Sequence, residues 1–83
     1  MLESKYQKKI IDKLESEGWY VIKLIKTNKN GIPDLFAVKE NTCQFIEVKG
    51  ANTPVSKLQE YRIKQLNDLG IPAKIMRYGV DAV

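Results

Sequence analysis

The chain has 83 residues, a formal net charge of +4 and a pI near 9.2. This length predicts one domain, residues 1–83, with a small core, and the charge favours anionic partners such as nucleic acid. The sequence contains no histidine, which excludes histidine zinc sites, Ser-His-Asp triads and histidine general bases. Its single cysteine and the lack of a membrane-length apolar run lead us to expect a cytoplasmic protein in a reducing compartment.

A first helix is predicted over about residues 2–17, with Gly18 as the left-handed residue that follows it. At helical spacing, one apolar arc contains Tyr6, Ile10, Ile11 and Leu14. Glu3 and Gln7 fall inside this arc. A carboxylate in the first turn also favours the helix dipole, so position alone leaves a terminal role and a functional role open for Glu3.

Residues 19–25 are rich in aromatic and β-branched side chains and predict a strand, and residues 26–31 predict a polar loop. Three lysines gather just before Pro33-Asp34, namely Lys23, Lys26 and Lys29. Solvent exposure is the simpler interpretation of any one of them. Together they suit contacts with nucleic-acid phosphates.

A β-hairpin is predicted next, with strands over residues 35–38 and 43–49 joined by a polar turn. Glu47 and Lys49 point to the same face of the second strand, which otherwise consists largely of core residues. Ionised groups are rarely buried unless they are paired or bind a metal. The hairpin also brings Asp34 beside Glu47, and a divalent cation would relieve the repulsion between the two carboxylates.

A second helix is predicted from residue 55 or 56 to residue 69. Ser56 and Gln59 have the spacing of a capping box, which is a sufficient structural reason for both. Gln59 also lies on the inward edge of the helix. Arg62 falls among leucines, where it either extends from the apolar face or reaches toward a bound phosphate.

A final strand is predicted over residues 71–77, and because it follows a helical crossover it should pair in parallel. The predicted order is α-β-β-β-α-β. We therefore expect an α/β fold with a mixed sheet flanked by helices. No element is assigned to residues 78–83.

Three segments together resemble the PD-(D/E)xK nuclease signature, and its VRR-NUC branch in particular: Gly31-Ile32-Pro33-Asp34, Glu47-Val48-Lys49 and Ser56-Lys57-Leu58-Gln59. The likeness covers nearly the whole chain. Small members of this branch occur as stand-alone phage and bacterial proteins, and others are the nuclease domains of larger DNA-repair enzymes. The resemblance implies a restriction-endonuclease-like core and a place in the cytoplasm of a bacterium or phage-infected cell.

The resemblance and the pattern together give three sets of expected site residues. The expected ligands of Mg²⁺ or Mn²⁺ are Glu3, Asp34, Glu47 and the backbone carbonyl of Val48. The expected catalytic residues are Asp34, Glu47, Lys49 and Gln59. The expected nucleic-acid contacts are Gln7, Lys23, Lys26, Lys29, Ser56, Lys57 and Arg62. Neighbouring carboxylates favour the protonated form of Lys49, so we expect it to position groups and stabilise charge instead of acting as a base.

The leading functional hypothesis is a metal-dependent DNA endonuclease, and the resemblance suggests branched DNA or four-way junctions as the substrate. A homodimer would allow two sites to cut two strands symmetrically. The alternative is a non-catalytic nucleic-acid-binding module with a nuclease-like fold, against which the presence of Asp34, Glu47 and Lys49 counts. A third interpretation is an interaction domain in which Glu47 and Lys49 form an ordinary surface ion pair.

Overall fold

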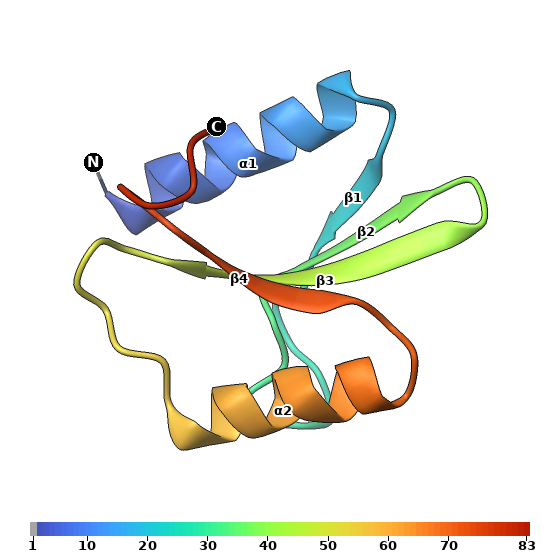
Figure 1. The fold of residues 1–83 in the computed structure, drawn as a ribbon. Coiled ribbons are helices and arrows are strands. Elements are labelled where there is room, and N and C mark those ends of the chain that lie inside the picture. The colour runs from blue at the N-terminus through green and yellow to red at the C-terminus, as the bar shows by residue number, and fades with distance from the viewer. Residues whose placement is uncertain (1) are drawn as a thin grey trace.

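Figure 1 shows the chain as a computed structural model that describes residues 2–83, so that Met1 of the predicted domain lies outside the described residues. The elements in order are α1 (Glu3–Ser16), β1 (Tyr20–Lys23), β2 (Leu35–Lys39), β3 (Thr42–Lys49), α2 (Lys57–Asp68) and β4 (Ala73–Arg77). The sheet has four strands, two antiparallel pairs and one parallel pair. The predicted α/β fold with its α-β-β-β-α-β order is confirmed.

The strands follow their sequence order across the sheet, β1-β2-β3-β4, so β1 and β4 form its two edges. The hairpin register pairs Leu35 with Ile46 and Phe36 with Phe45. β3 then pairs in parallel with β4, as the helical crossover predicted. The last strand begins at Ala73, two residues later than expected, since Pro72 has no N–H to donate to a neighbouring strand.

The apolar core lies between α1 and the sheet. Its fully buried members are Tyr6, Ile10, Leu35, Ile46 and Val48. Ile11 and Leu14 pack against this cluster from the edge of the same helix. The apolar arc predicted for the first helix is therefore the surface that α1 buries.

α2 covers the opposite face of the sheet (Figure 1) and has no buried residue. Its first turn is instead closed by a complete capping box. The Ser56 hydroxyl accepts from the N–H of Gln59, and the Gln59 side chain accepts from the N–H of Ser56. Gly70 follows the helix with a φ of +88°, in the left-handed region that favours glycine after a helix.

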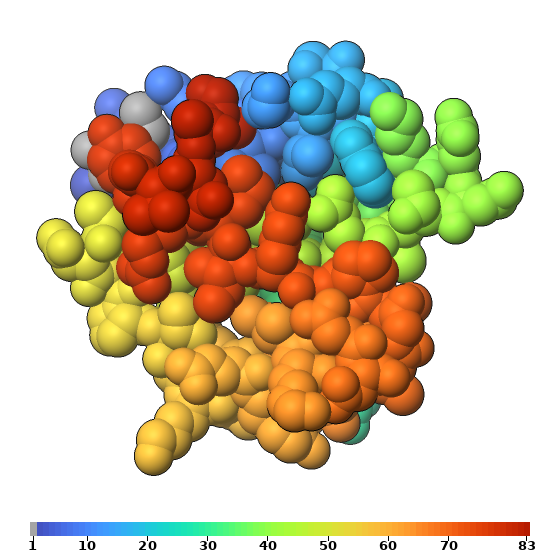
Figure 2. Space-filling view, viewed as in Figure 1, coloured from blue at the N-terminus to red at the C-terminus, as the bar shows by residue number. Residues whose placement is uncertain are grey.

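The C-terminal residues 78–83 return to α1, and Figure 2 shows them in red against the blue helix. Tyr6 Oη donates to the carbonyl of Asp81 at 2.7 Å, and the rings of Tyr6 and Tyr78 meet edge to face at 5.5 Å. Burial, and then the Asp81 carboxylate, raise the pKa of Tyr6, which keeps it a neutral donor. No helix within the described residues has the length and apolar character needed to cross a membrane.

Candidate active site

The end of β3 carries two charged side chains that are almost completely buried. Glu47 is 3% exposed and Lys49 is 6% exposed, and Lys49 Nζ lies 3.4 Å from Glu47 Oε2. Alternation along the strand explains the placement: Ile46 and Val48 join the core under α1, while Glu47 and Lys49 face α2. The burial argues against the interpretation of this pair as an ordinary surface ion pair.

Asp34 lies beside this pair, as the hairpin geometry predicted. Its Oδ2 accepts a hydrogen bond from the backbone N–H of Val48 at 2.9 Å. The bond holds the carboxylate at the start of β2 against the end of β3. Pro33, which precedes it, is buried and fixes the backbone at this entry.

Glu47 is in an environment that opposes its ionisation. Burial first, and repulsion from the Asp34 carboxylate second, raise the pKa of Glu47 from 4.5 to about 7, although Lys49 lowers it. The more distant Glu3 adds a further upward contribution. A strongly perturbed carboxyl beside a second carboxylate and a lysine is typical of functional sites.

Gln59 makes both a capping contact and an inward contact. Its Oε1 accepts from the N–H of Ser56 in the capping box, and its Nε2 donates to Glu47 Oε2 at 3.0 Å. The two ends of one amide thus join the beginning of α2 to the buried carboxyl. Ser56 itself is occupied as the helix cap, in the arrangement that the capping-box spacing predicted.

The first turn of α1 differs from the prediction that Glu3 and Gln7 lie within the buried arc. Glu3 is exposed and Gln7 is half-buried, because the fully buried stripe of α1 consists of Tyr6 and Ile10. Glu3 Oε2 nevertheless accepts from the backbone N–H of Gly50 at 3.3 Å. The Glu3 carboxylate therefore borders the site from its rim.

The chemistry of the donor set fits a hard divalent cation, which prefers oxygen ligands. Asp34 and Glu47 supply two carboxylates whose mutual repulsion such an ion would relieve. Across residues 2–83, however, no three His, Cys, Asp or Glu side chains converge closely enough to hold a metal ion together. The full predicted ligand set, which includes Glu3 and the Val48 carbonyl, stays a prediction.

Apart from Gln7 and Ser56, the predicted nucleic-acid contacts form two groups. Exposed side chains that are available to a ligand are Lys23, Lys26, Lys29 and Lys57. Arg62 instead contacts acceptors of the protein: its Nε donates to the carbonyl of Asn30 at 2.9 Å, and its Nη1 donates to Gln65 Oε1 at 3.1 Å.

Arg77 supports the site and is not among the predicted residues. Its Nη1 donates to the carbonyls of Gly50 and Thr53 at 2.9 and 2.6 Å, which fixes the connection that leaves the site. Arg77 is also the parallel partner of Lys49 in the sheet. Knowledge of this parallel register would have identified Arg77 as a neighbour of the site. The sequence alone does not determine which residues pair across two parallel strands.

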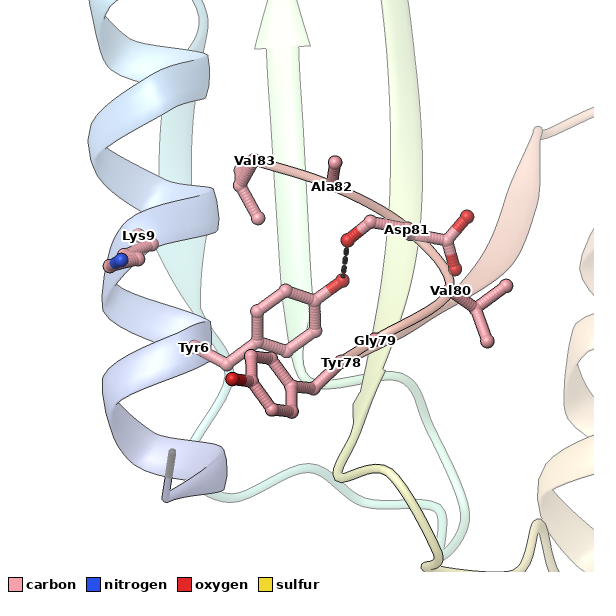
Figure 3. Close-up of a pocket in the computed structure, with 8 residues that line it drawn as sticks. All are labelled: Tyr6, Lys9, Tyr78, Gly79, Val80, Asp81, Ala82 and Val83. Carbon is pink, nitrogen blue, oxygen red and sulfur yellow. Dashed lines mark hydrogen bonds between the residues drawn. The ribbon is translucent and has the colours of Figure 1, made fainter.

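A separate cavity of about 380 Å³ lies between α1 and the C-terminal segment (Figure 3). Its lining residues are Tyr6, Lys9, Tyr78, Gly79, Val80, Asp81, Ala82 and Val83. None of the predicted catalytic residues is among them. This cavity is therefore distinct from the site at the end of β3.

Comparison with known proteins assigns this arrangement to a family. The chain is 33% identical over 63 aligned residues to a crossover junction endodeoxyribonuclease of Sulfolobus islandicus rod-shaped virus 1. The aligned part covers 74% of this chain and 52% of the viral protein, so the chain spans about half the length of that relative. Residues 2–78 match the VRR-NUC domain, which includes every predicted catalytic residue. The chain belongs to the VRR-NUC domain family.

Proposed function

We propose that this protein is a metal-dependent endonuclease that hydrolyses phosphodiester bonds in DNA. The observation that carries the proposal is the buried Glu47–Lys49 pair beside Asp34, in a chain of the VRR-NUC family. A degenerate binding module has no need to retain a carboxyl whose pKa is raised to about 7. The activity for which the viral relative is named supports DNA as the substrate.

In this proposal Asp34, Glu47 and the Val48 carbonyl hold Mg²⁺ or Mn²⁺, and Glu3 contributes from the rim. When bound, the ion supplies charge neutralisation at the phosphate and a more acidic water. Gln59 Nε2 keeps Glu47 Oε2 oriented. That contact holds the carboxyl in one rotamer when its negative charge develops.

Lys49 places a positive charge within 3.4 Å of Glu47, inside a site that excludes most water. An ammonium in such surroundings stabilises negative charge more strongly than one in bulk water. We assign Lys49 to orienting the attacking water and stabilising the charge that develops on the phosphate. Asp34 is held by the Val48 N–H, so its second oxygen is the one free to bind an ion.

We further propose branched DNA, and four-way junctions in particular, as the preferred substrate. The support is the name of the viral relative, a crossover junction endodeoxyribonuclease. Cutting two strands of a junction symmetrically needs two sites, and a homodimer would supply them. Sedimentation with and without junction DNA would measure that assembly directly.

The test is cleavage of labelled linear, flap and four-way-junction DNA with Mg²⁺ or Mn²⁺. We expect metal-dependent cleavage, fastest on the junction, that EDTA abolishes. Glu47→Ala should lower the single-turnover rate by roughly 10³-fold or more, since it removes a carboxyl that contacts the reacting site. Binding without cleavage by the unaltered protein under both metals would refute the proposal and favour the non-catalytic module.

A further inference from the structure

The segment between β1 and β2, residues 24–34, forms a closed loop beside the candidate active site. The backbone N–H of Leu24 donates to the carbonyl of Asp34 at 2.8 Å and closes its base. Within the loop, Thr27 Oγ1 donates to the carbonyl of Lys29 at 2.6 Å. The loop therefore has a defined shape, and its last residue is also one of the candidate metal ligands.

α2 supports this loop at two points, and Figure 1 shows the segment reaching from the sheet toward that helix. Gly31 has a φ of +80°, and a Cβ there would lie 2.7 Å from Leu58 Cγ, so only glycine fits. Arg62 Nε donates to the carbonyl of the preceding residue, Asn30. Arg62 thus holds the loop against α2 with its guanidinium.

The loop encloses a polar cavity of about 310 Å³. Its charged lining residues are Lys26, Lys29 and Asp34, so the lining carries two cations and one carboxylate. This volume is at the lower end of the roughly 300–1,000 Å³ of typical ligand sites. Such a site suits a single phosphodiester group, and two lysines with polar neighbours are the usual means of binding one.

We propose that loop 24–34 is a subsite for a DNA backbone phosphate adjacent to the phosphate that is cleaved. The inference rests on the proposed function, because Asp34 belongs both to the loop and to the catalytic carboxylates. A phosphate bound by Lys26 and Lys29 fixes the position of the strand relative to Glu47. Arg62 is a positioning residue that shapes the subsite and does not itself contact DNA.

The test compares Lys26→Gln/Lys29→Gln with the unaltered protein in DNA binding by fluorescence anisotropy, with EDTA present to prevent cleavage. Each phosphate that a protein neutralises contributes about 0.9 to the salt slope of log affinity, and the two lysines share one phosphate, so the slope should fall by about 1. Between about 50 and 200 mM salt the double variant should lose roughly threefold less affinity than the unaltered protein. Both residues are exposed, and equal thermal midpoints would verify that folding is unchanged.

The matched control is Lys8→Gln/Lys13→Gln, which makes the same charge change on α1, the helix on the opposite side of the sheet. This control should keep the slope of the unaltered protein. An unchanged slope in the loop variant, or an equal fall in both variants, would overturn the inference.

Arg62→Lys separates a positioning role from direct phosphate contact. It keeps the charge but cannot reproduce the guanidinium contacts to both Asn30 and Gln65. We expect Arg62→Lys and Arg62→Gln to weaken DNA binding alike at equal thermal stability. Full retention of affinity by the lysine variant alone would show that Arg62 acts as a phosphate contact.

Glu47→Ala distinguishes failure of the inference from failure of the proposed function. If Glu47→Ala binds DNA but does not cut it, while the loop variant loses salt slope and still cuts at saturating protein, both proposals hold. If the unaltered protein never cuts DNA and the loop variant still loses salt slope, the nuclease proposal fails and the subsite stands. If the unaltered protein cuts DNA and the loop variant keeps its salt slope, the nuclease proposal stands and the subsite fails.

Discussion

The two helices lie on opposite faces of one sheet and are held there by different forces. α1 has no side-chain cap, yet it buries Tyr6 and Ile10 in the core. α2 buries no residue, but it has a complete capping box. Polar side chains of α2 also form hydrogen bonds with the rest of the fold. Among these, Gln59 reaches Glu47 and Arg62 reaches Asn30. The apolar face of the sheet thus supplies stability, and the polar face supplies the site.

The largest effect should come from the packed helix. Ile10→Ala should lower the free energy of unfolding by roughly 2–5 kcal/mol, because it leaves a cavity in a core that is small to begin with. Ile63→Ala in α2, where the side chain is only half-buried, is the control and should cost roughly 1 kcal/mol. Urea denaturation measures both. Equal losses would break the contrast between the helices.

The next effect is a pH dependence of stability that arises from Glu47, on the face of the sheet that α2 covers. Between pH 4.5 and about 7, folded Glu47 retains a proton that the unfolded chain has released. Raising the pH across this window therefore favours unfolding, by as much as about 3 kcal/mol. In EDTA, the contribution of Glu47 to the free energy of unfolding should be greatest near pH 4.5 and should fall toward pH 7. Glu47→Gln should flatten the decline, and the same decline in that variant would exclude Glu47 as its source.

A smaller effect should show that α2 depends on its cap. Ser56→Ala removes the acceptor of the Gln59 N–H and should cost about 1 kcal/mol. Ser4→Ala, at an exposed position in the first turn of α1, should change stability by less than about 0.5 kcal/mol. Thermal unfolding of both variants gives the comparison. A larger loss for Ser4→Ala would reverse our view of which helix relies on its terminus.

The smallest effect on stability should come from removing an exposed ion pair, and it should be the same in both helices. Each helix contains an exposed i,i+4 ion pair, Lys8 with Asp12 in α1 and Lys64 with Asp68 in α2. Exposed pairs of this kind contribute little. Lys8→Met and Lys64→Met should leave the urea midpoint essentially unchanged. A clear shift in only one of them would identify a contribution from surface charge that packing and capping do not explain.

The elements and their order followed from periodicity, because alternation along β3 and the arc on α1 are properties of the sequence itself. The same alternation placed Glu47 and Lys49 together on the face opposite the core. The hairpin brought Asp34 to them, and its bond to the Val48 N–H confirms that proximity. These parts of the site depend on local geometry, which a sequence determines well.

The remaining details depend on contacts between distant segments. No spacing rule shows that Arg62 would contact the carbonyl of Asn30, or that Arg77 would hold the Gly50–Thr53 connection. Glu3 was expected inside the buried arc, but it is at the first residue of α1, where the helix leaves the core. Hydrogen bonds from a side chain to a distant backbone carbonyl leave no periodic pattern in the sequence, so periodicity does not predict them.

The edges of the sheet have a consequence for the self-association of the protein at high concentration. An edge strand exposes unpaired backbone groups on which another chain can extend the sheet. Here β1 is only four residues long and ends in Lys23, and β4 carries the exposed Lys74. Like charges at both edges oppose pairing of an edge strand with the edge strand of another copy. The cations at these edges therefore oppose aggregation, and neutralising Lys23 should favour it through the exposed Tyr20.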